Sequence, residues 1–104
     1  MDLATTDHIT GKELEPLGLV QGNIVLATTI GKSFMASLKL FTGGEMQQYT
    51  ELLKEARATA TERMVQEAQT LGADAVVMVR YVTSQIVDPA AEVMVYGTAV
   101  RYKK

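Results

Sequence analysis

The sequence of 104 residues contains no cysteine, no tryptophan and only one histidine. Without cysteine, the chain cannot form a disulfide, a thiolate nucleophile or a cysteine-based zinc or iron–sulfur site. The formal net charge is only −2, and the basic residues are scattered along the chain. Because a protein that follows a nucleic-acid backbone needs clustered positive charge, these features predict that no nucleic acid is bound.

Long apolar runs are also missing. No stretch reaches the roughly 18 consecutive apolar residues of a membrane-spanning helix, and the first residues lack the basic and apolar regions of a signal peptide. We therefore expect a cytoplasmic protein that does not contact a membrane. Hydrophobic residues make up 47% of the sequence, and the length predicts a single domain over residues 1–104, in which residues 1–16 form a short N-terminal edge segment.

One long amphipathic helix is predicted from Glu45 to Leu71. Apolar residues recur there at steps of three and four, which places them on one face of a helix. Gly72 supplies the left-handed residue that commonly ends a helix. Several positions of this face are alanine, so the surface beneath it must approach the helix backbone closely. The face comprises Met46, Tyr49, Leu53, Ala56, Ala60, Met64, Ala68 and Leu71.

Three strands are predicted over residues 17–29, 75–86 and 92–102, from their β-branched and apolar residues. Gly18 and Gly22 indicate bulges or bends in the first of them. The expected fold class is therefore α/β (α+β), a two-layer structure in which an antiparallel sheet packs against one long helix and a short helix.

The last two strands are expected to pair with Ile86 opposite Glu92. This register places small and β-branched side chains against the long helix. Gly97 would allow the helix backbone to approach, so Gly97→Val is expected to destabilise the fold. The helix side then carries Val77, Val79, Val93, Val95, Gly97 and Ala99, and the outer side carries Met78, Arg80, Val82, Met94, Tyr96, Thr98 and Val100.

Self-association is predicted from two apolar surfaces. A short helix is expected from Ser33 to Phe41, and its apolar side chains cover more of its circumference than one core can bury. The outer sheet side also carries methionine and valine, which need cover from a partner. Aspartate at Leu38 or Met94 is therefore expected to produce smaller species in solution.

The most prominent polar group on the outer sheet side is Arg80 with Tyr96 and Thr98, joined by Glu92 at the start of the last strand. One interpretation is a cluster of hydrogen bonds and ion pairs between subunits. The other is a site that binds an anion or another small ligand. No arrangement of serine, histidine and acid is indicated, so we do not expect an enzyme.

A metal site is considered at His8 beside Asp7. Soft or borderline cations prefer thiolate or imidazole ligands, and one histidine is insufficient within one subunit. In a ring, however, one residue per subunit is repeated around the axis. The alternative is an exposed histidine near the start of the chain, and the methionines are interpreted as core residues. The cofactor therefore remains unknown, with a metal ion as one candidate.

Several motifs occur in a characteristic order, namely Gly43-Gly44-Glu45, Leu71-Gly72-Ala73-Asp74-Ala75 and Tyr96-Gly97-Thr98-Ala99-Val100. On these motifs the sequence resembles the YbjQ family of small bacterial and archaeal proteins. The resemblance implies a dodecin-like subunit, a homopentameric ring and a family label of heavy-metal-binding. It leaves two functions open: an oligomeric protein that holds a small anion, metabolite or metal, and a structural or adaptor ring that recruits another protein and holds no ligand.

Overall fold

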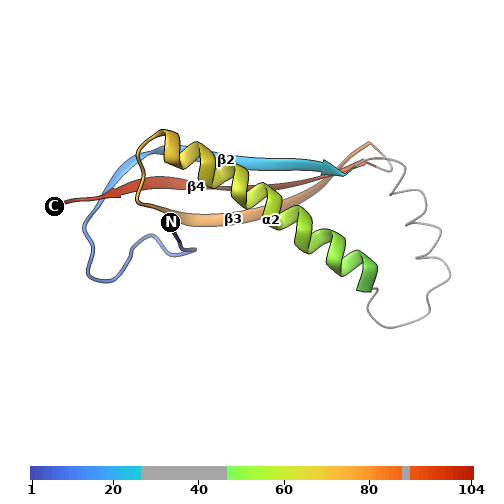
Figure 1. Cartoon of the computed structure of the whole chain (residues 1–104), viewed down its shortest axis with the longest axis horizontal. Coiled ribbons are helices and arrows are strands. Elements are labelled where there is room, and N and C mark those ends of the chain that lie inside the picture. The colour runs from blue at the N-terminus through green and yellow to red at the C-terminus, as the bar shows by residue number, and fades with distance from the viewer. Residues whose placement is uncertain (27–46, 88–89) are drawn as a thin grey trace.

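The computed structural model describes residues 1–26, 47–87 and 90–104. Four strands form one sheet, in the order β1-β3-β4-β2, and helix α2 lies across one face of it (Figure 1). The elements are β1 (Asp2–Leu3), β2 (Leu14–Leu26), α2 (Gln47–Thr70), β3 (Ala75–Val87) and β4 (Ala90–Tyr102). The predicted α+β class with a long helix on a sheet is therefore confirmed. The predicted helix at residues 33–41 and the end of the predicted strand at residues 27–29 lie outside the described residues.

The long helix α2 follows the predicted apolar periodicity. Ala56, Ala60, Met64 and Ala68 are each at most 2% exposed, which confirms that the small residues face the sheet. After α2, Gly72 has a φ of +75°, and the Ala73 amide donates a hydrogen bond to the Ala68 carbonyl at 3.1 Å. Glycine adopts this backbone conformation without steric cost, so it ends the helix where the sequence predicted. This described helix is too polar to cross a membrane.

Strand β2 approaches the helix backbone through Gly22, which was expected to mark a bulge or bend. A Cβ atom added there would lie 2.0 Å from the Ala60 carbonyl oxygen and 2.5 Å from the Met64 nitrogen. The bulge instead lies between Pro16 and Gly18, where the pairing of β2 with β4 shifts register. Gly18 itself has a φ of +141°, so the bulge predicted for Gly18 is confirmed.

The close approach expected at Gly97 was assigned to the wrong neighbour. A Cβ atom at Gly97 would lie 2.7 Å from Val76 Cγ1 and 2.9 Å from the Val77 carbonyl oxygen. Both neighbours belong to the adjacent strand β3 rather than to the helix. Gly97 therefore accommodates the irregular pairing of β3 with β4, and Gly22 is the position that admits the helix.

The predicted pairing of Ile86 with Glu92 is also wrong, because Glu92 lies opposite Ser84. The hairpin is tighter than expected, with Val87 opposite Ala90, and a second register shift occurs between Val77 and Arg80. Met78, inside that shift, has a φ of +56°. A bulge of this kind changes which face the following side chains occupy.

One consequence of the bulge is that Val77 faces away from the helix, contrary to prediction. It packs with Ala75 and Val100 in a second cluster on the other side of the sheet, joined by Ile9, Leu14 and Tyr102. Val79 contributes to the main cluster between sheet and helix, as predicted. That main cluster consists of Val20, Ala60, Met64, Ala68, Val76, Val79, Val95 and Ala99.

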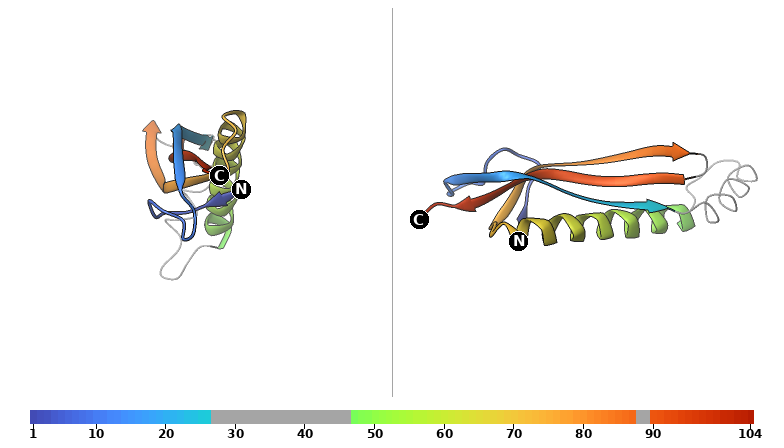
Figure 2. Two further views of the ribbon diagram at one scale, coloured as in Figure 1. Left: turned by 90° about the vertical axis from the view of Figure 1, so that its left-hand side faces the viewer. Right: turned by 90° about the horizontal axis from the view of Figure 1, so that it is seen from above.

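The N-terminal segment supplies the cover for this second cluster. Strand β1 pairs in parallel with the start of β3, and the amides of Val79 and Met78 donate to the carbonyls of Ala4 and Thr6. The parallel direction of β1 makes the sheet mixed, and residues 14–16 of the expected N-terminal edge segment belong to strand β2. The right-hand view of Figure 2 shows the N-terminal loop and helix α2 on opposite sides of the strands. We call the sheet side opposite α2 the outer face.

Candidate functional site

The outer face is organised in rows that run across three strands. In one row, Arg80 of β3 lies opposite Tyr96 of β4, and Tyr96 lies opposite Gln21 of β2. Adjacent strands are about 4.8 Å apart, so these three side chains, all hydrogen-bond donors, span about 10 Å. We call them the Arg80 row. The next row toward the hairpin consists of Val82, Met94 and Asn23.

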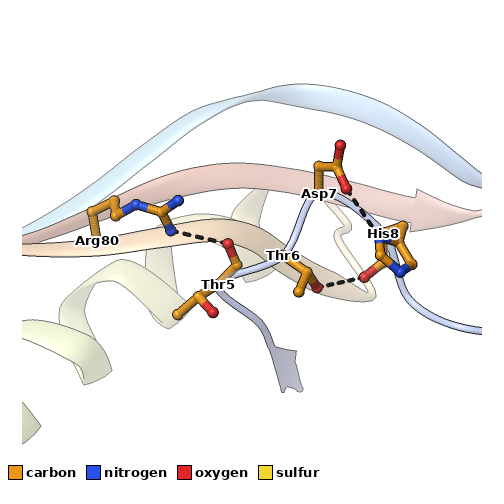
Figure 3. A network of polar contacts seen from close by, with 5 residues as sticks. All are labelled: Thr5, Thr6, Asp7, His8 and Arg80. Carbon is orange, nitrogen blue, oxygen red and sulfur yellow. Dashed lines mark hydrogen bonds and ion pairs between the residues drawn. The ribbon is translucent and has the colours of Figure 1, made fainter.

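Arg80 supplies the positive charge of its row. Its Nη1 donates a hydrogen bond to the Thr5 carbonyl oxygen at 2.9 Å (Figure 3). The same Nη1 donates a second hydrogen bond to the Val79 carbonyl oxygen, also at 2.9 Å. In residues 1–26, 47–87 and 90–104, no carboxylate forms an ion pair with this guanidinium. The two carbonyl groups orient the guanidinium without neutralising its charge. Its other N–H groups have the geometry to bind a carboxylate or phosphate.

The other predicted site residues lie at different distances from Arg80. Thr98 is one row away, opposite Leu19 and Val77. Glu92 is four residues from Tyr96 along β4, a separation of about 13 Å in a strand. The Glu92 carboxylate instead accepts a hydrogen bond from Asn23 Nδ2 at 2.9 Å. The structure thus brings Arg80 and Tyr96 together and leaves Glu92 in a separate contact.

Gln21 and Thr5 were missed by the sequence analysis. Gln21 alternates with apolar residues in β2, which is a signal for one face of a strand. That signal could not show which strand β2 pairs with. Thr5 acts through its backbone carbonyl, and no pattern of side chains reveals such a role.

Asp7 and His8 form an exposed pair in the N-terminal loop. His8 Nδ1 lies 2.9 Å from Asp7 Oδ1, with the two side chains 70% and 79% exposed. The hydrogen bond with His8, followed by the charge of that residue, holds the pKa of the Asp7 carboxyl below its usual value of 3.8. Thr6 Oγ1 donates to the His8 carbonyl at 2.7 Å and fixes the loop locally (Figure 3).

We expect this pair to be visible in a pH titration. Because the pKa of Asp7 is lower in the folded chain than in the unfolded chain, the contact stabilises the fold above pH 3.8. That stabilisation is lost as the pH falls through the folded pKa. NMR titration should give an Asp7 midpoint below 3.8, and His8→Ala should raise it toward that value. Equal midpoints in the two proteins would show that the pair does not form in solution.

A second polar cluster joins the two ends of the chain. The Tyr102 hydroxyl donates a hydrogen bond to Asp2, and the Tyr102 amide donates to Asp74 at 2.8 Å. The hydrogen bond to Asp2, with the charges of Asp2 and Asp74, raises the pKa of Tyr102 to about 12. Lys12 Nζ lies 5.0 Å from the centre of the Tyr102 ring. These contacts hold the N-terminal segment against the sheet and do not adjoin the Arg80 row.

A YbjQ family model described as "Putative heavy-metal-binding" matches residues 1–103. This chain belongs to the YbjQ family. A relative in Clostridium novyi, named UPF0145 protein, is 52% identical over 101 residues, covering 97% of this chain and 98% of the relative. A UPF0145 protein of Colwellia psychrerythraea is 50% identical over 105 residues, covering both chains completely.

A solved structure resembles this YbjQ protein in fold. It is the crystal structure of a protein of unknown function from Pediococcus pentosaceus, assigned to the DUF74 family. The TM-score is 0.63 at 16% sequence identity, and the match covers 99% of this chain and 98% of the other. At this identity the likeness supports the α+β fold alone. The family is thus uncharacterised in function, with no catalytic activity in any of these names.

The metal named in the family description does not fit the described residues of one chain. They contain no group of three or more histidine, cysteine, aspartate and glutamate side chains that could hold a metal ion. Asp7 and His8 offer two ligands, whereas structural zinc sites use four. With Nδ1 engaged by the carboxylate, only Nε2 of His8 is left to ligate. A metal at this loop would therefore need ligands from further copies of the chain.

Proposed function

We propose that this protein is a non-catalytic, self-associating protein that binds a small anion at the Arg80 row. The observation that carries the proposal is the guanidinium of Arg80, which has no carboxylate partner among the described residues. It lies beside Tyr96 on a sheet face that the helix does not cover. A guanidinium oriented by carbonyl oxygens is suited to a carboxylate or phosphate group, because both present two oxygens to its parallel N–H donors.

Association is supported by the apolar side chains of the outer face. Leu19 is 70% exposed, Val25 is 51% exposed and Val82 is 40% exposed. Fully burying an exposed side chain of this size is worth roughly 1.5–3 kcal/mol, and each of these residues would gain the fraction that corresponds to its exposed area, which favours contact with another copy. Five copies is the number that the family resemblance implies. A scaffold or adaptor ring without a ligand is the second candidate, because these apolar residues favour assembly whether or not an anion binds.

The proposal predicts phosphate binding that depends on Arg80. Isothermal titration calorimetry with inorganic phosphate should show binding to the wild type and at least a tenfold loss of affinity in Arg80→Gln. Arg101→Gln is the matched control, because Arg101 lies on the same sheet but far along β4 from the row. Native mass spectrometry of the same samples reports the subunit number and any retained ligand.

Two outcomes would contradict the proposal. Equal phosphate affinity in the wild type and Arg80→Gln would remove the anion site. A mass corresponding to a single chain at micromolar concentration would remove the assembly. Purified oligomers that retain no ligand and do not bind phosphate would favour the scaffold or adaptor ring instead.

A further inference from the structure

The sheet has two long backbone edges without a partner in the described part of the chain. At the β3 edge, β1 pairs only with Ala75 and Val76. The carbonyls of Ala4 and Thr6 accept hydrogen bonds from the next amides of β3, as far as Val79. From Tyr81 onward, β3 has β4 on one side and no described strand on the other. At the opposite end of the strand order, β2 pairs only with β4.

Pro16 and the bulge that ends at Gly18 discourage strand addition at the start of β2, but the later residues of both edges lack such features. Residues 17–26 of β2 and residues 81–87 of β3 contain no charged side chain and no proline. Natural proteins commonly place lysine, other charges or proline on open edges, since unpaired amides and carbonyls otherwise recruit a strand. One contact partly covers the β2 edge, where Arg63 of the helix donates to the Asn23 carbonyl at 2.6 Å. Among the described residues, no other printed contact covers the β2 edge between Leu19 and Leu26.

The exposure of apolar side chains follows the same edges. Leu19 and Val25 of β2 and Val82 of β3 are the exposed apolar residues of these rows, whereas Met94 in the central strand β4 is only partly exposed. A partner that covered the outer face would need exposed apolar side chains in the centre of that face. A partner strand that pairs with an edge needs exposed apolar side chains on the edge strands, and these are the strands that carry them, because the side chains of neighbouring strands pack against each other.

We propose that the β2 edge of one copy pairs with the β3 edge of the next copy, and that this contact completes the anion site. Both strands run antiparallel to β4, so they are parallel to each other and would pair in parallel between copies. The contact joins two different surfaces, which makes it head-to-tail and able to close into a ring. It rests on the self-association and anion binding proposed above.

The alternation of side chains identifies what the partner contributes. If the sheets of two copies join into one continuous sheet, the outer-face residues of β2 in one copy lie beside the outer-face residues of β3 in the next copy. Within residues 19–26 of β2, Arg80 and Val82 can then be flanked by the partner's Leu19, Gln21, Asn23 or Val25. Two of these four, Gln21 and Asn23, are amides, and they occupy consecutive outer-face positions between the two apolar residues. The partner therefore brings an amide donor within one row of Arg80, whichever of these registers forms.

Disulfide trapping tests this contact directly, because the chain contains no cysteine. Val82→Cys is combined in turn with each of four substitutions on β2. Within one copy, β2 and β3 are separated by β4, which is about 10 Å and beyond the roughly 7 Å limit of a disulfide. Any reducible cross-link therefore joins two copies. The four substitutions are Leu19→Cys, Gln21→Cys, Asn23→Cys and Val25→Cys.

We expect at least one pair to give a ladder of covalent multimers under mild oxidation, with the largest band reporting the subunit number. Val82→Cys with Leu71→Cys is the control, since Leu71 is 42% exposed and lies beyond the end of the helix, off both edges. Four pairs that cross-link no more than this control would overturn the inference, provided that circular dichroism shows folded variants.

The result separates the two proposals. Cross-linking without phosphate binding would contradict the anion site but support the edge contact. Phosphate binding without cross-linking in any of the four pairs would contradict the edge contact alone. If the protein both cross-links and binds phosphate, at least one of the variants Gln21→Ala and Asn23→Ala should bind phosphate at least threefold more weakly, with an unchanged oligomer mass. Unchanged phosphate affinity in both variants would overturn the contribution of the partner's amides.

Discussion

Replacing Gly22 with alanine should destabilise the fold by about 3 kcal/mol, the upper part of the range for overpacked cores. The added Cβ would lie 2.0 Å from the Ala60 carbonyl oxygen and 2.5 Å from the Met64 nitrogen. Both are backbone atoms in the middle of α2, so no side-chain rotation can relieve the contact. The helix would have to move away from β2 and lose packing along the whole alanine face. Urea denaturation followed by circular dichroism measures the loss.

Asn23→Ala is the matched control for this experiment. Asn23 is the next residue of the same strand, faces the opposite side and makes one exposed hydrogen bond to Glu92. Its removal should cost about 1 kcal/mol or less. A Gly22→Ala protein as stable as the wild type would show that helix and sheet are not in backbone contact at this position.

Gly97→Val should be nearly as damaging, at about 2–3 kcal/mol. The new Cβ would meet Val76 Cγ1 at 2.7 Å and the Val77 carbonyl oxygen at 2.9 Å, and the branched side chain adds further crowding. Strand β3 is already irregular at this point because of the bulge at Met78. It would have to separate from β4 to accept the side chain. The change in the free energy of unfolding is again the measurement.

A double-mutant cycle identifies which neighbour is responsible. Gly97→Ala is measured in the wild-type background and in a Val76→Ala background, which removes the Cγ1 atom. If Val76 Cγ1 causes the clash, Gly97→Ala should cost less in the second background, because residues in contact are coupled. Additive effects would instead point to a neighbour other than Val76, such as the Val77 carbonyl oxygen at 2.9 Å.

The two glycines show why this assignment needed the tertiary structure. A glycine in a strand signals that something approaches closely, but it does not say what. The order β1-β3-β4-β2 places β2 under the helix at Gly22, while Gly97 lies in the central strand beside the β3 bulge. Two residues with the same local signal therefore have different neighbours.

Elements whose signals are local could be predicted from the amino-acid sequence. The three- and four-residue spacing from Ala56 to Ala68 defines a helix face because the period of an α-helix is 3.6 residues. The β-branched segments of β3 and β4 indicate strands for similarly local reasons. Gly72 ends the helix because its conformation depends only on its own lack of a side chain.

How those elements pack together became clear from the folded structure alone. Register depends on the length of the hairpin connection and on the Met78 bulge. An Asp-Pro pair indicates a turn without fixing which residues face each other, and a methionine does not indicate a bulge. Since side chains alternate with a period of two, a one-residue bulge transfers Val77 to the outer face. The same geometry sets Arg80 beside Tyr96 and leaves Glu92 with Asn23. The outer face and its open edges are properties of strand order, which arises from contacts between residues far apart in the chain.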